Sequence, residues 1–481
     1  MNIYTVRKAT QGLANYINKE VTDKNLRKVA IAYDSRRMSP EFSDEASRVL
    51  AANGVKAYVF ESLRPVPLLS YAVRELGCTA GIVITASHNP PEYNGFKAYW
   101  SDGAQVTTPK DVEIIDQVNL VKKFEDVKTM SREEAMSAGL LEVISTDLDD
   151  AYIEELKKLI IDPELVKSEG KDFKVVYTPI HGSGNLPVRR ILKEIGFENV
   201  SVVPEQELPD GNFPTVDYPN PEDPKAFKMA LALAEKENAD VVMATDPDAD
   251  RLGVFAKTAE GDYKALNGNN IGMILMHYIL SRKAALGVLP ENAAVVGTIV
   301  STYMARPITE EYGVKLFETL TGFKYIGEKI KEFETEGTYD FQFGYEESYG
   351  ALIGTHARDK DAVVAVMGVA EAAAYYKSQG KTLYEALLDL YEKYGYYRET
   401  LKAITLKGKE GVEKIEHILA TLRKNPPTVL AGVKVESARD DLEDTLKNLS
   451  TGEVTTTGLP SSNVLYYDLE DGSWFCVRPS G

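Results

Sequence analysis

The chain of 481 residues is 44% hydrophobic and 27% charged, which is the composition of an ordinary globular protein. Its formal net charge of −18 argues against a nucleic-acid partner, because nucleic-acid binding depends on Lys and Arg side chains that neutralise phosphates. The sequence has no apolar run of membrane-spanning length and no amino-terminal secretory signal, so we expect a cytoplasmic protein with no membrane partner.

Apolar runs of strand length alternate with segments of helical periodicity along most of the chain. The predicted strands cover residues 28–33, 56–60, 80–85, 173–177, 200–203, 240–244, 252–255 and 294–299. The predicted helices cover residues 40–52, 67–76, 186–195, 224–237, 272–286, 324–334 and 383–393. This alternation predicts an α/β fold in which helices pack on parallel or mixed sheets.

The length predicts three or four domains, at roughly 100–200 residues for each. Breaks in the pattern fall near residue 148, near residue 262 and after residue 393. The domains are therefore predicted at residues 1–148, 149–262, 263–393 and 394–481. We expect the first three to be similar mixed α/β domains, and the last, richer in Thr, Ser and Gly, to be a smaller α+β domain.

Three carboxylates, Asp246, Asp248 and Asp250, alternate along a short loop that follows the predicted strand 240–244 and precedes Arg251. Carboxylates this close repel one another unless a cation lies between them, and oxygen ligands favour Mg²⁺, Mn²⁺ or Ca²⁺. An EF-hand loop that begins at Asp246 is excluded, because its sixth position requires Gly and is Arg251. A metal site and a solvated acidic turn both remain open at this point.

A second distinctive loop extends from Thr85 to Lys97, after another predicted strand. Ser87 lies at a tight turn, where His88 or Lys97 could act as a neighbouring base. The Gly-x-Ser-x-Gly turn of hydrolases is absent, since Thr85 and Asn89 occupy the glycine positions, and acyl transfer is therefore disfavoured. The alternative is that Ser87 only caps the turn.

Phosphoryl transfer would give the two loops a common task. A phosphoserine carries roughly −1.5 to −2 charges at neutral pH, so a divalent cation would have to bridge it to three aspartates. A serine phosphate and three carboxylates around Mg²⁺ form a coherent site, because the metal offsets the charge of the group in transit.

These two loops, Thr-Ala-Ser-His-Asn-Pro and Asp-Pro-Asp-Ala-Asp-Arg, resemble those of the α-D-phosphohexomutase superfamily, which includes phosphoglucomutases and phosphomannomutases. Further stretches resemble loops of the second, third and fourth domains of that superfamily. In chain order they are residues 178–184, 321–327, 344–350, 358–361 and 478–481. The resemblance covers most of the chain, and it keeps the order of the superfamily.

The resemblance implies roles for individual residues. Phosphorylated Ser87 would be the phosphoryl donor and acceptor, and Ser87 with the three aspartates of the acidic loop would hold one Mg²⁺ in each active site. Lys97 matches a lysine proposed as general acid or base, and Arg251 would lie near the transferring group. His88 is a further catalytic candidate, but for His88 and His181 the resemblance fits structural hydrogen bonding at least as well as it fits chemistry. The implied substrate-binding residues are Thr321, Gly322, Lys324, Glu346, Ser348, Lys360, Arg478 and Ser480.

The sugar loops resemble those of phosphoglucomutases, so the expected reaction interconverts α-D-glucose 1-phosphate and glucose 6-phosphate. Phosphoserine and glucose 1,6-bisphosphate would be the intermediates, and the bisphosphate would also serve as activator. The partners would be small sugar phosphates, bound in a central, closable cleft among the four domains. Dual glucose/mannose enzymes often have His where this chain has Gly350. Phosphomannomutase and phosphopentomutase specificities stay open, because residues 4–12 and 34–40 resemble a branch that includes phosphopentomutase-like members.

The resemblance also predicts segments that this sequence does not contain. Superfamily members open with a glycine-rich loop that carries an arginine, and they continue past the position of Gly481 with Thr-Glu-Pro-Lys. We therefore expect a chain trimmed at both ends, and one rival hypothesis is a catalytically impaired fragment that only binds sugar phosphates. A second rival is an aspartyl-phosphate phosphatase, but that motif usually has Thr or Val where Asp250 stands.

Overall fold

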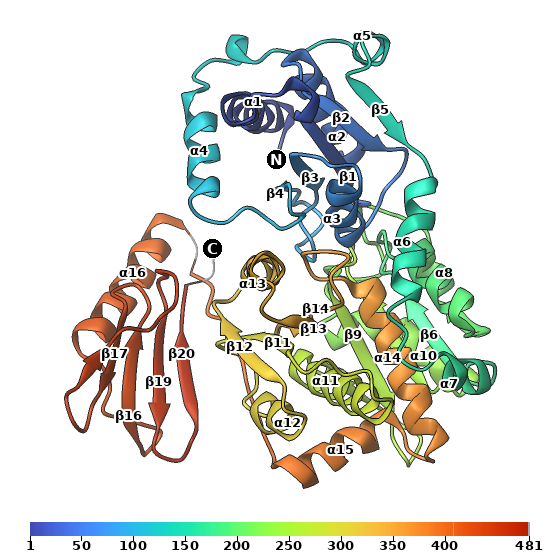
Figure 1. Cartoon of the computed structure of the whole chain (residues 1–481), viewed down its shortest axis with the longest axis vertical. Helices are drawn as coiled ribbons and strands as arrows, with labels where there is room; N and C mark the ends of the chain where they lie inside the picture. The colour runs from blue at the N-terminus through green and yellow to red at the C-terminus, as the bar shows by residue number, and fades with distance from the viewer. Residues whose placement is uncertain (407, 480–481) are drawn as a thin grey trace. The chain divides into compact units, whose positions relative to one another are not determined.

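The computed structural model describes residues 1–406 and 408–479, and it divides the chain into two compact units. The first unit comprises residues 1–317 and 322–397, and the second comprises residues 318–321 and 398–481. Three sheets belong to the first unit, and each sheet with its helices forms one α/β domain; a fourth sheet belongs to the second unit (Figure 1).

The first sheet has the strand order β4-β3-β1-β2-β5, with β4 antiparallel and the other strands parallel. Successive side chains of β1 point to opposite faces. Val29 and Ile31 join the core under α1 and α2, whereas Ala30 and Ala32 join the core on the α3 side. The elements are α1 (Ile3–Glu20), β1 (Lys28–Tyr33), α2 (Ser39–Ala52), β2 (Lys56–Phe60), α3 (Val66–Glu75), β3 (Ala80–Ile84), β4 (Phe96–Trp100), α4 (Lys110–Leu120), α5 (Arg132–Ser137) and β5 (Leu141–Ile144).

The second sheet has the order β10-β9-β8-β6-β7, in which β7, β6 and β8 are parallel and β9 and β10 are antiparallel. Every residue of β8 is buried, as the predicted apolar run 240–244 required. The elements are α6 (Asp147–Lys157), α7 (Pro163–Glu169), β6 (Lys174–Thr178), α8 (Asn185–Ile195), β7 (Asn199–Val202), α9 (Pro204–Glu207), α10 (Lys228–Glu237), β8 (Val241–Thr245), β9 (Leu252–Lys257) and β10 (Tyr263–Leu266).

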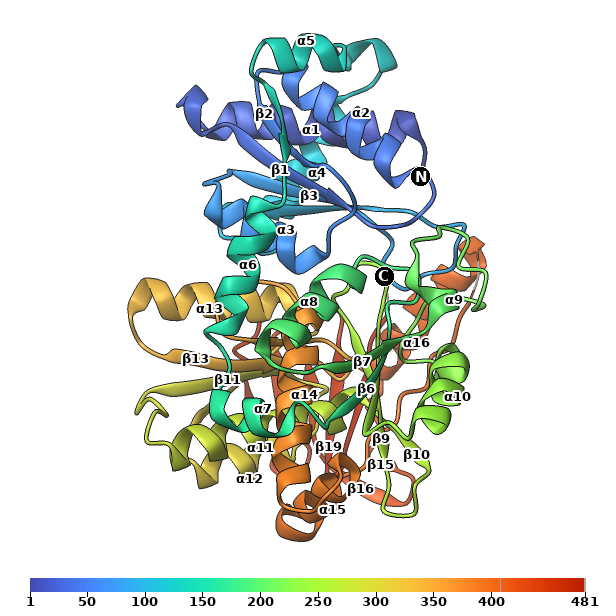
Figure 2. The same cartoon turned by 90° about the vertical axis from the view of Figure 1, so that its right-hand side faces the viewer.

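The third sheet has the order β12-β11-β13-β14, with β11 parallel and β14 antiparallel to β13. Helix α14 lies beside β8 and α8 of the second domain (Figure 2), and it is buried along nearly its whole length. The elements are α11 (Gly268–Ala285), β11 (Ala293–Thr298), α12 (Ala305–Glu311), β12 (Lys315–Thr319), α13 (Phe323–Glu336), β13 (Asp340–Tyr345), β14 (Ala351–Ile353), α14 (Ala362–Ser378) and α15 (Leu383–Tyr394).

The three sheets share one plan, which confirms the expectation of three similar mixed α/β domains. In each sheet a parallel strand is followed in the chain by an antiparallel neighbour: β3 by β4, β8 by β9, and β13 by β14. The loops between these strands are residues 85–95, 246–251 and 346–350. Equivalent positions in the three domains therefore carry the serine loop, the acidic loop and the Glu-Glu-Ser-Tyr-Gly loop.

The second unit contains an antiparallel sheet of order β18-β17-β16-β19-β20 and helix α16, which confirms the expected α+β domain. Its core contains Leu419 of α16 together with Val435, Leu465 and Tyr467 of the sheet. The elements are α16 (Gly408–Lys424), β15 (Val429–Leu430), β16 (Val433–Asp440), β17 (Thr445–Asn448), β18 (Val454–Thr455), β19 (Leu465–Leu469) and β20 (Trp474–Val477).

Two predicted helices need correction. The predicted helix 224–237 begins as a 3₁₀ turn at Pro224–Phe227, and only Lys228–Glu237 is α-helical. The predicted helix 272–286 begins earlier, at Gly268, because Asn267 caps it by accepting the Asn270 N–H. The three predicted domain boundaries stay predictions. Among the described residues, no helix combines the length and apolar character needed to cross a bilayer.

Candidate active site

The serine loop presents Ser87 to the acidic loop. Ser87 has a left-handed backbone with φ of 50°, a conformation that costs free energy in a residue other than glycine and often marks a functional position. Its N–H donates to Thr85 Oγ1 at 2.8 Å, which fixes the turn. Its hydroxyl donates to Asp246 Oδ2 at 2.8 Å, so two loops that are far apart in the sequence meet at this hydrogen bond.

Arg36, for which the sequence analysis assigns no role, holds the serine loop in shape. Its buried guanidinium lies 3.4 Å from the Asp34 carboxylate, and burial raises the pKa of Asp34 to about 6. Arg36 also donates at 2.5–3.0 Å to the backbone carbonyls of Ser87, Asn89, Pro90 and Tyr93. The signal in the sequence is the polar run Asp-Ser-Arg directly after the buried strand β1.

The three carboxylates of the acidic loop are buried and close together. One oxygen from each of Asp246, Asp248 and Asp250 lies within 4.8 Å of the others. Burial, and then the charge of Asp248, raises the pKa of Asp246 well above its usual value. Asp246 Oδ1 accepts the backbone N–H groups of Asp250 and Arg251, each at 3.1 Å.

The acidic loop fits a hard divalent cation. Asp248 Oδ1 and Asp250 Oδ1 are buried, and neither has a hydrogen-bond partner among the residues that the structure describes. Buried carboxylate oxygens without a partner carry a large desolvation cost, which a bound cation would remove. The donor set contains only oxygen, as Mg²⁺ and Ca²⁺ prefer.

Two lysines partly balance the three carboxylates. Lys97 Nζ lies 2.9 Å from Asp248 Oδ2 and 3.4 Å from Asp250 Oδ2, and Lys360 Nζ lies 3.3 Å from Asp250 Oδ2. Burial alone would lower the pKa of Lys97, but the charges of Asp248 and Asp250 raise it above its usual value. Burial likewise opposes the charge of Lys360, whose pKa is nevertheless raised by Asp250 and Asp359. Both ammonium groups are therefore protonated at neutral pH.

His88 lies beside Ser87, and Arg251 lies beside Asp250. His88 Nδ1 is 3.3 Å from Ser87 Oγ, and burial, with the charge of Arg251, lowers the pKa of His88 to about 4. The imidazole is therefore neutral at pH 7. Arg251 donates to Glu222, and its Nε lies 3.8 Å from Asp250 Oδ1.

The loop of residues 178–184 supports the acidic loop and leaves His181 a structural role. The two ring nitrogens of His181 lie 3.0 Å from Leu208 O and 2.9 Å from Thr215 Oγ1, so both make hydrogen bonds within the second domain. Ser183 donates through its N–H and its hydroxyl to Pro247 O, each at 2.8 Å. This pair of bonds fixes the backbone between the first two aspartates.

Three predicted substrate residues gather in the third domain. Glu346 Oε1 accepts the N–H of Gly322 at 2.7 Å, and burial raises the pKa of Glu346. Lys360 Nζ lies 5.7 Å from the centre of the Phe323 ring. Ser348 is half-buried in the same loop as Glu346. The structure thus brings Gly322, Glu346 and Lys360 together around one edge of the third sheet.

Of the other predicted substrate residues, one belongs to the first unit, two belong to the second unit and one is outside the described part of the chain. Lys324 Nζ is 5.2 Å from the centre of the Tyr325 ring and 4.0 Å from an Asp111 carboxylate oxygen. Thr321, half-buried, and Arg478, exposed after β20, belong to the second unit. Ser480 lies outside the described residues.

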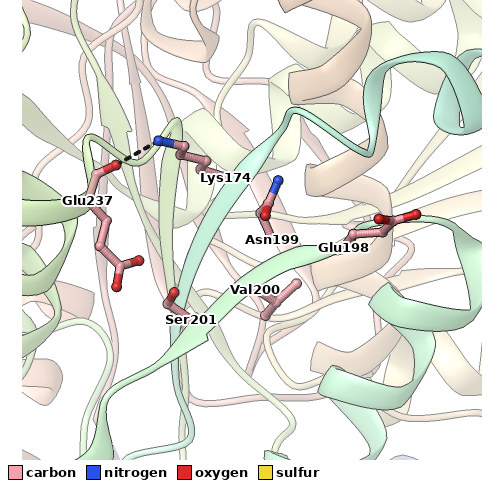
Figure 3. A pocket seen from close by; sticks show the side chains of 6 residues that line it. All are labelled: Lys174, Glu198, Asn199, Val200, Ser201 and Glu237. Atoms are coloured by element: carbon pink, nitrogen blue, oxygen red, sulfur yellow. Dashed lines mark hydrogen bonds between the residues drawn. The ribbon is translucent and has the colours of Figure 1, made fainter.

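A surface pocket of about 390 Å³ lies elsewhere, at the starts of β6 and β7 (Figure 3). Lys174 Nζ donates there to Glu237 O at 3.1 Å. The pocket is lined by Lys174, Glu198, Asn199, Val200, Ser201 and Glu237. None of these residues belongs to the loops described above, so this pocket is not the candidate active site.

Comparison with known proteins connects this geometry to one family. Family profiles for phosphoglucomutase/phosphomannomutase alpha/beta/alpha domains I, II and III match residues 1–124, 150–261 and 267–394. The chain is 35% identical over 488 residues to a phosphoglucomutase of Staphylococcus aureus (strain MRSA252), across 100% of this chain and 84% of that protein. The chain belongs to the phosphoglucomutase/phosphomannomutase family. This family member is a mutase, an isomerase that acts as a phosphohexomutase.

Other relatives agree with the assignment to the phosphoglucomutase/phosphomannomutase family. A phosphoglucomutase of Staphylococcus haemolyticus is 34% identical over 484 residues, across 100% of this chain and 85% of that protein. Two solved structures share the fold. A Burkholderia thailandensis family protein has a TM-score of 0.67 at 19% identity, across 98% of this chain and 87% of that one. The open form of the Paramecium phosphoglucomutase has a TM-score of 0.69 at 19% identity, across 99% and 84%.

Proposed function

We propose that this phosphohexomutase interconverts α-D-glucose 1-phosphate and glucose 6-phosphate through a phosphorylated Ser87 and a glucose 1,6-bisphosphate intermediate. The observation that carries the proposal is the 2.8 Å hydrogen bond from the Ser87 hydroxyl to Asp246, at the edge of a buried cluster of three carboxylates. A hydroxyl in this position exchanges a phosphoryl group only if a cation offsets the negative charge around it.

We assign that cation as one Mg²⁺ per active site, held by Asp246, Asp248 and Asp250 together with Ser87. The unpartnered oxygens Asp248 Oδ1 and Asp250 Oδ1, within the described part of the chain, support this assignment. When bound, Mg²⁺ would supply positive charge to the phosphoryl group in transit. The aspartates are thus metal ligands in this proposal, and the nucleophile is the Ser87 hydroxyl.

Three side chains near Ser87 and the acidic loop could transfer protons or bind the negative phosphoryl oxygens: Lys97, His88 and Arg251. Protonated Lys97 holds a proton that it can give to an oxygen leaving the phosphoryl group. Neutral His88, 3.3 Å from Ser87 Oγ, can exchange a proton with that hydroxyl. The guanidinium of Arg251 can bind phosphoryl oxygens, since its Nε has no hydrogen-bond acceptor in the described structure.

The substrate would bind where the third domain approaches these groups. A buried carboxylate can accept hydrogen bonds from two sugar hydroxyls, which is the role we assign to Glu346, with Ser348 beside it. Lys360 would bind a phosphate or sugar oxygen. The remaining residues proposed for substrate binding are Thr321, Gly322, Lys324, Arg478 and Ser480.

The preference for glucose rests on the staphylococcal phosphoglucomutases and on Gly350 at the position where dual-specificity enzymes often have His. A coupled assay should compare glucose, mannose and ribose 1-phosphates with Mg²⁺ and glucose 1,6-bisphosphate present. We expect glucose 1-phosphate to give the highest kcat/KM. A higher kcat/KM for mannose 1-phosphate or ribose 1-phosphate would show that this compound, and not glucose 1-phosphate, is the preferred substrate.

The same assay tests the role of Ser87. We expect Ser87→Ala to lose activity by at least about 10⁴-fold, because it removes the group that carries the phosphoryl. Ser101→Ala, at an exposed serine after β4, is the matched control and should keep wild-type turnover. Full activity of the Ser87→Ala protein would contradict the proposed function for every sugar.

A further inference from the structure

The segment of residues 358–362 carries Lys360 through a joint between the three α/β domains. At its start, the Arg358 N–H donates to Ser70 Oγ of the first domain at 2.8 Å. At its end, the Ala362 N–H donates to Ala249 O of the acidic loop in the second domain at 3.1 Å. The backbone on both sides of Lys360 is therefore fixed to a neighbouring domain.

Asp359 lies at the centre of this joint and is buried. Its Oδ1 accepts from Lys360 twice, at 2.8 Å from the N–H and at 3.1 Å from Nζ. Its Oδ2 accepts from two side chains of the first domain, the Tyr99 hydroxyl at 2.8 Å and Gln105 Nε2 at 2.9 Å. One oxygen of the carboxylate thus faces Lys360, and the other is held by the first domain.

Tyr99 connects Asp359 to the strand that carries Lys97. Tyr99 and Lys97 are two apart on β4 and therefore point to the same face of the first sheet. Lys97 reaches Asp248 at 2.9 Å, while Tyr99 reaches Asp359. Burial raises the pKa of Tyr99 well above its usual value, so its hydroxyl remains a neutral hydrogen-bond donor at working pH.

We propose that Tyr99 and Asp359 are positioning residues that hold the Lys360 ammonium group in place for the substrate. A lysine side chain has many rotamers, and Lys360 is restricted here by a carboxylate on each side, Asp359 at 3.1 Å and Asp250 at 3.3 Å. The Asp359 carboxylate is tied to the first domain by hydrogen bonds from Tyr99 and Gln105, and the Asp250 carboxylate is tied to it by the ion pair with Lys97. The inference rests on the proposed function, because it takes Lys360 as a substrate-binding group.

The test is a double-mutant cycle of Tyr99→Phe and Lys360→Met. Loss of one hydrogen bond to the Asp359 carboxylate should loosen Lys360, so we expect Tyr99→Phe to raise KM about 10-fold and to change kcat less than about 2-fold. In the Lys360→Met background, Tyr99→Phe should have almost no further effect on KM. Calorimetric titration with glucose 6-phosphate should show the same pattern in Kd, and this readout does not require turnover.

Tyr152→Phe is the matched control. Tyr152 is also buried, and its hydroxyl donates to Asp361 Oδ2 at 2.7 Å in the same joint, one residue beyond Lys360. We expect it to lower the free energy of unfolding as much as Tyr99→Phe does and to leave KM unchanged. An unchanged KM in Tyr99→Phe, an equal effect in both Lys360 backgrounds, or an equal rise of KM in Tyr152→Phe would overturn the positioning role.

This outcome is separable from failure of the proposed function. The kinetic cycle uses whichever of glucose, mannose and ribose 1-phosphates the wild-type protein turns over. The calorimetric titration uses the product of that reaction, which is glucose 6-phosphate if the substrate is glucose 1-phosphate. An active Ser87→Ala protein would remove the proposed function. If the enzyme depends on Ser87 but the effects of Tyr99→Phe and Lys360→Met on KM are additive, only the positioning role of Tyr99 and Asp359 is contradicted.

Discussion

Replacing Asp248 with Asn removes one charge from the acidic loop with little change of shape. In the folded chain Asp248 Oδ2 lies 2.9 Å from Lys97 Nζ, and Oδ1 has no hydrogen-bond partner among the described residues. The substitution therefore has two effects, one on the metal-free protein and one on Mg²⁺ binding. It alters the repulsion and attraction inside the metal-free protein, and it removes one of the three carboxylates proposed to hold Mg²⁺.

The stability of the metal-free protein and its affinity for Mg²⁺ should change by different amounts. The carboxylate oxygens lie within 4.8 Å of one another, so at an effective dielectric constant of about 20 two unit charges there repel by at least about 3 kcal/mol, and Asn would relieve two such repulsions, with Asp246 and Asp250. It would also lose an attraction of about 6 kcal/mol to Lys97 at 2.9 Å. These terms nearly cancel, so the stability of the metal-free protein should change by no more than about 2 kcal/mol. Mg²⁺ affinity has no such compensation and should fall at least about 100-fold.

Thermal unfolding during a Mg²⁺ titration measures both effects. Wild-type protein should gain Tm with Mg²⁺, since a ligand at about 100 times its Kd adds about 2.7 kcal/mol to the free energy of unfolding. Asp248→Asn should gain almost nothing at that concentration and should have less than about 1% of wild-type turnover. Asp116→Asn, an exposed aspartate on α4, is the control and should behave as wild type. A variant at Asp248 with wild-type Mg²⁺ stabilisation and turnover would refute the reasoning.

Two further predictions concern packing and pH. A Cβ at Gly350 would lie 2.1 Å from Lys360 Cδ, so Gly350→Ala should cost about 1–3 kcal/mol of stability in urea unfolding, and Lys360→Ala should suppress that cost. Burial raises the pKa of Glu371, which accepts the Ile161 and Asp162 N–H groups, to about 7. Because the folded pKa is raised, this contribution to stability is full below about pH 4 and is lost as the pH rises through 7. The free energy of unfolding should therefore fall between about pH 4 and pH 7, and it should fall less in Glu371→Gln; an equal fall in both proteins would contradict this.

Much of the fold and the two central loops could be predicted from the sequence because their signals are local. The strands β1 and β2 coincide with predicted apolar runs, and polar loops follow β3 and β8 directly. Ser87 and the three aspartates can therefore be recognised from the sequence alone. The structure places the Ser87 hydroxyl beside Asp246, and this contact is what a site shared by the two loops requires.

The rest depends on contacts between distant segments, which leave no local pattern. Helix α14 is buried on almost all sides, so its sequence lacks the amphipathic period that predicts helices. Tyr99 meets Asp359 across a sequence separation of 260 residues. Arg36 contributes by donating to backbone carbonyls, which any sequence would provide. Such residues become visible only when the packing between domains is known.

The most direct test of the central claim is to locate the phosphate on the enzyme itself. The protein should be incubated with glucose 1,6-bisphosphate and Mg²⁺, digested, and its peptides analysed by mass spectrometry with and without mild alkaline hydroxylamine. The account predicts one phosphate on Ser87, stable to hydroxylamine and absent from Ser87→Ala. A hydroxylamine-labile phosphate on Asp246 or Asp248, or an active enzyme with no phosphate on Ser87, would contradict it.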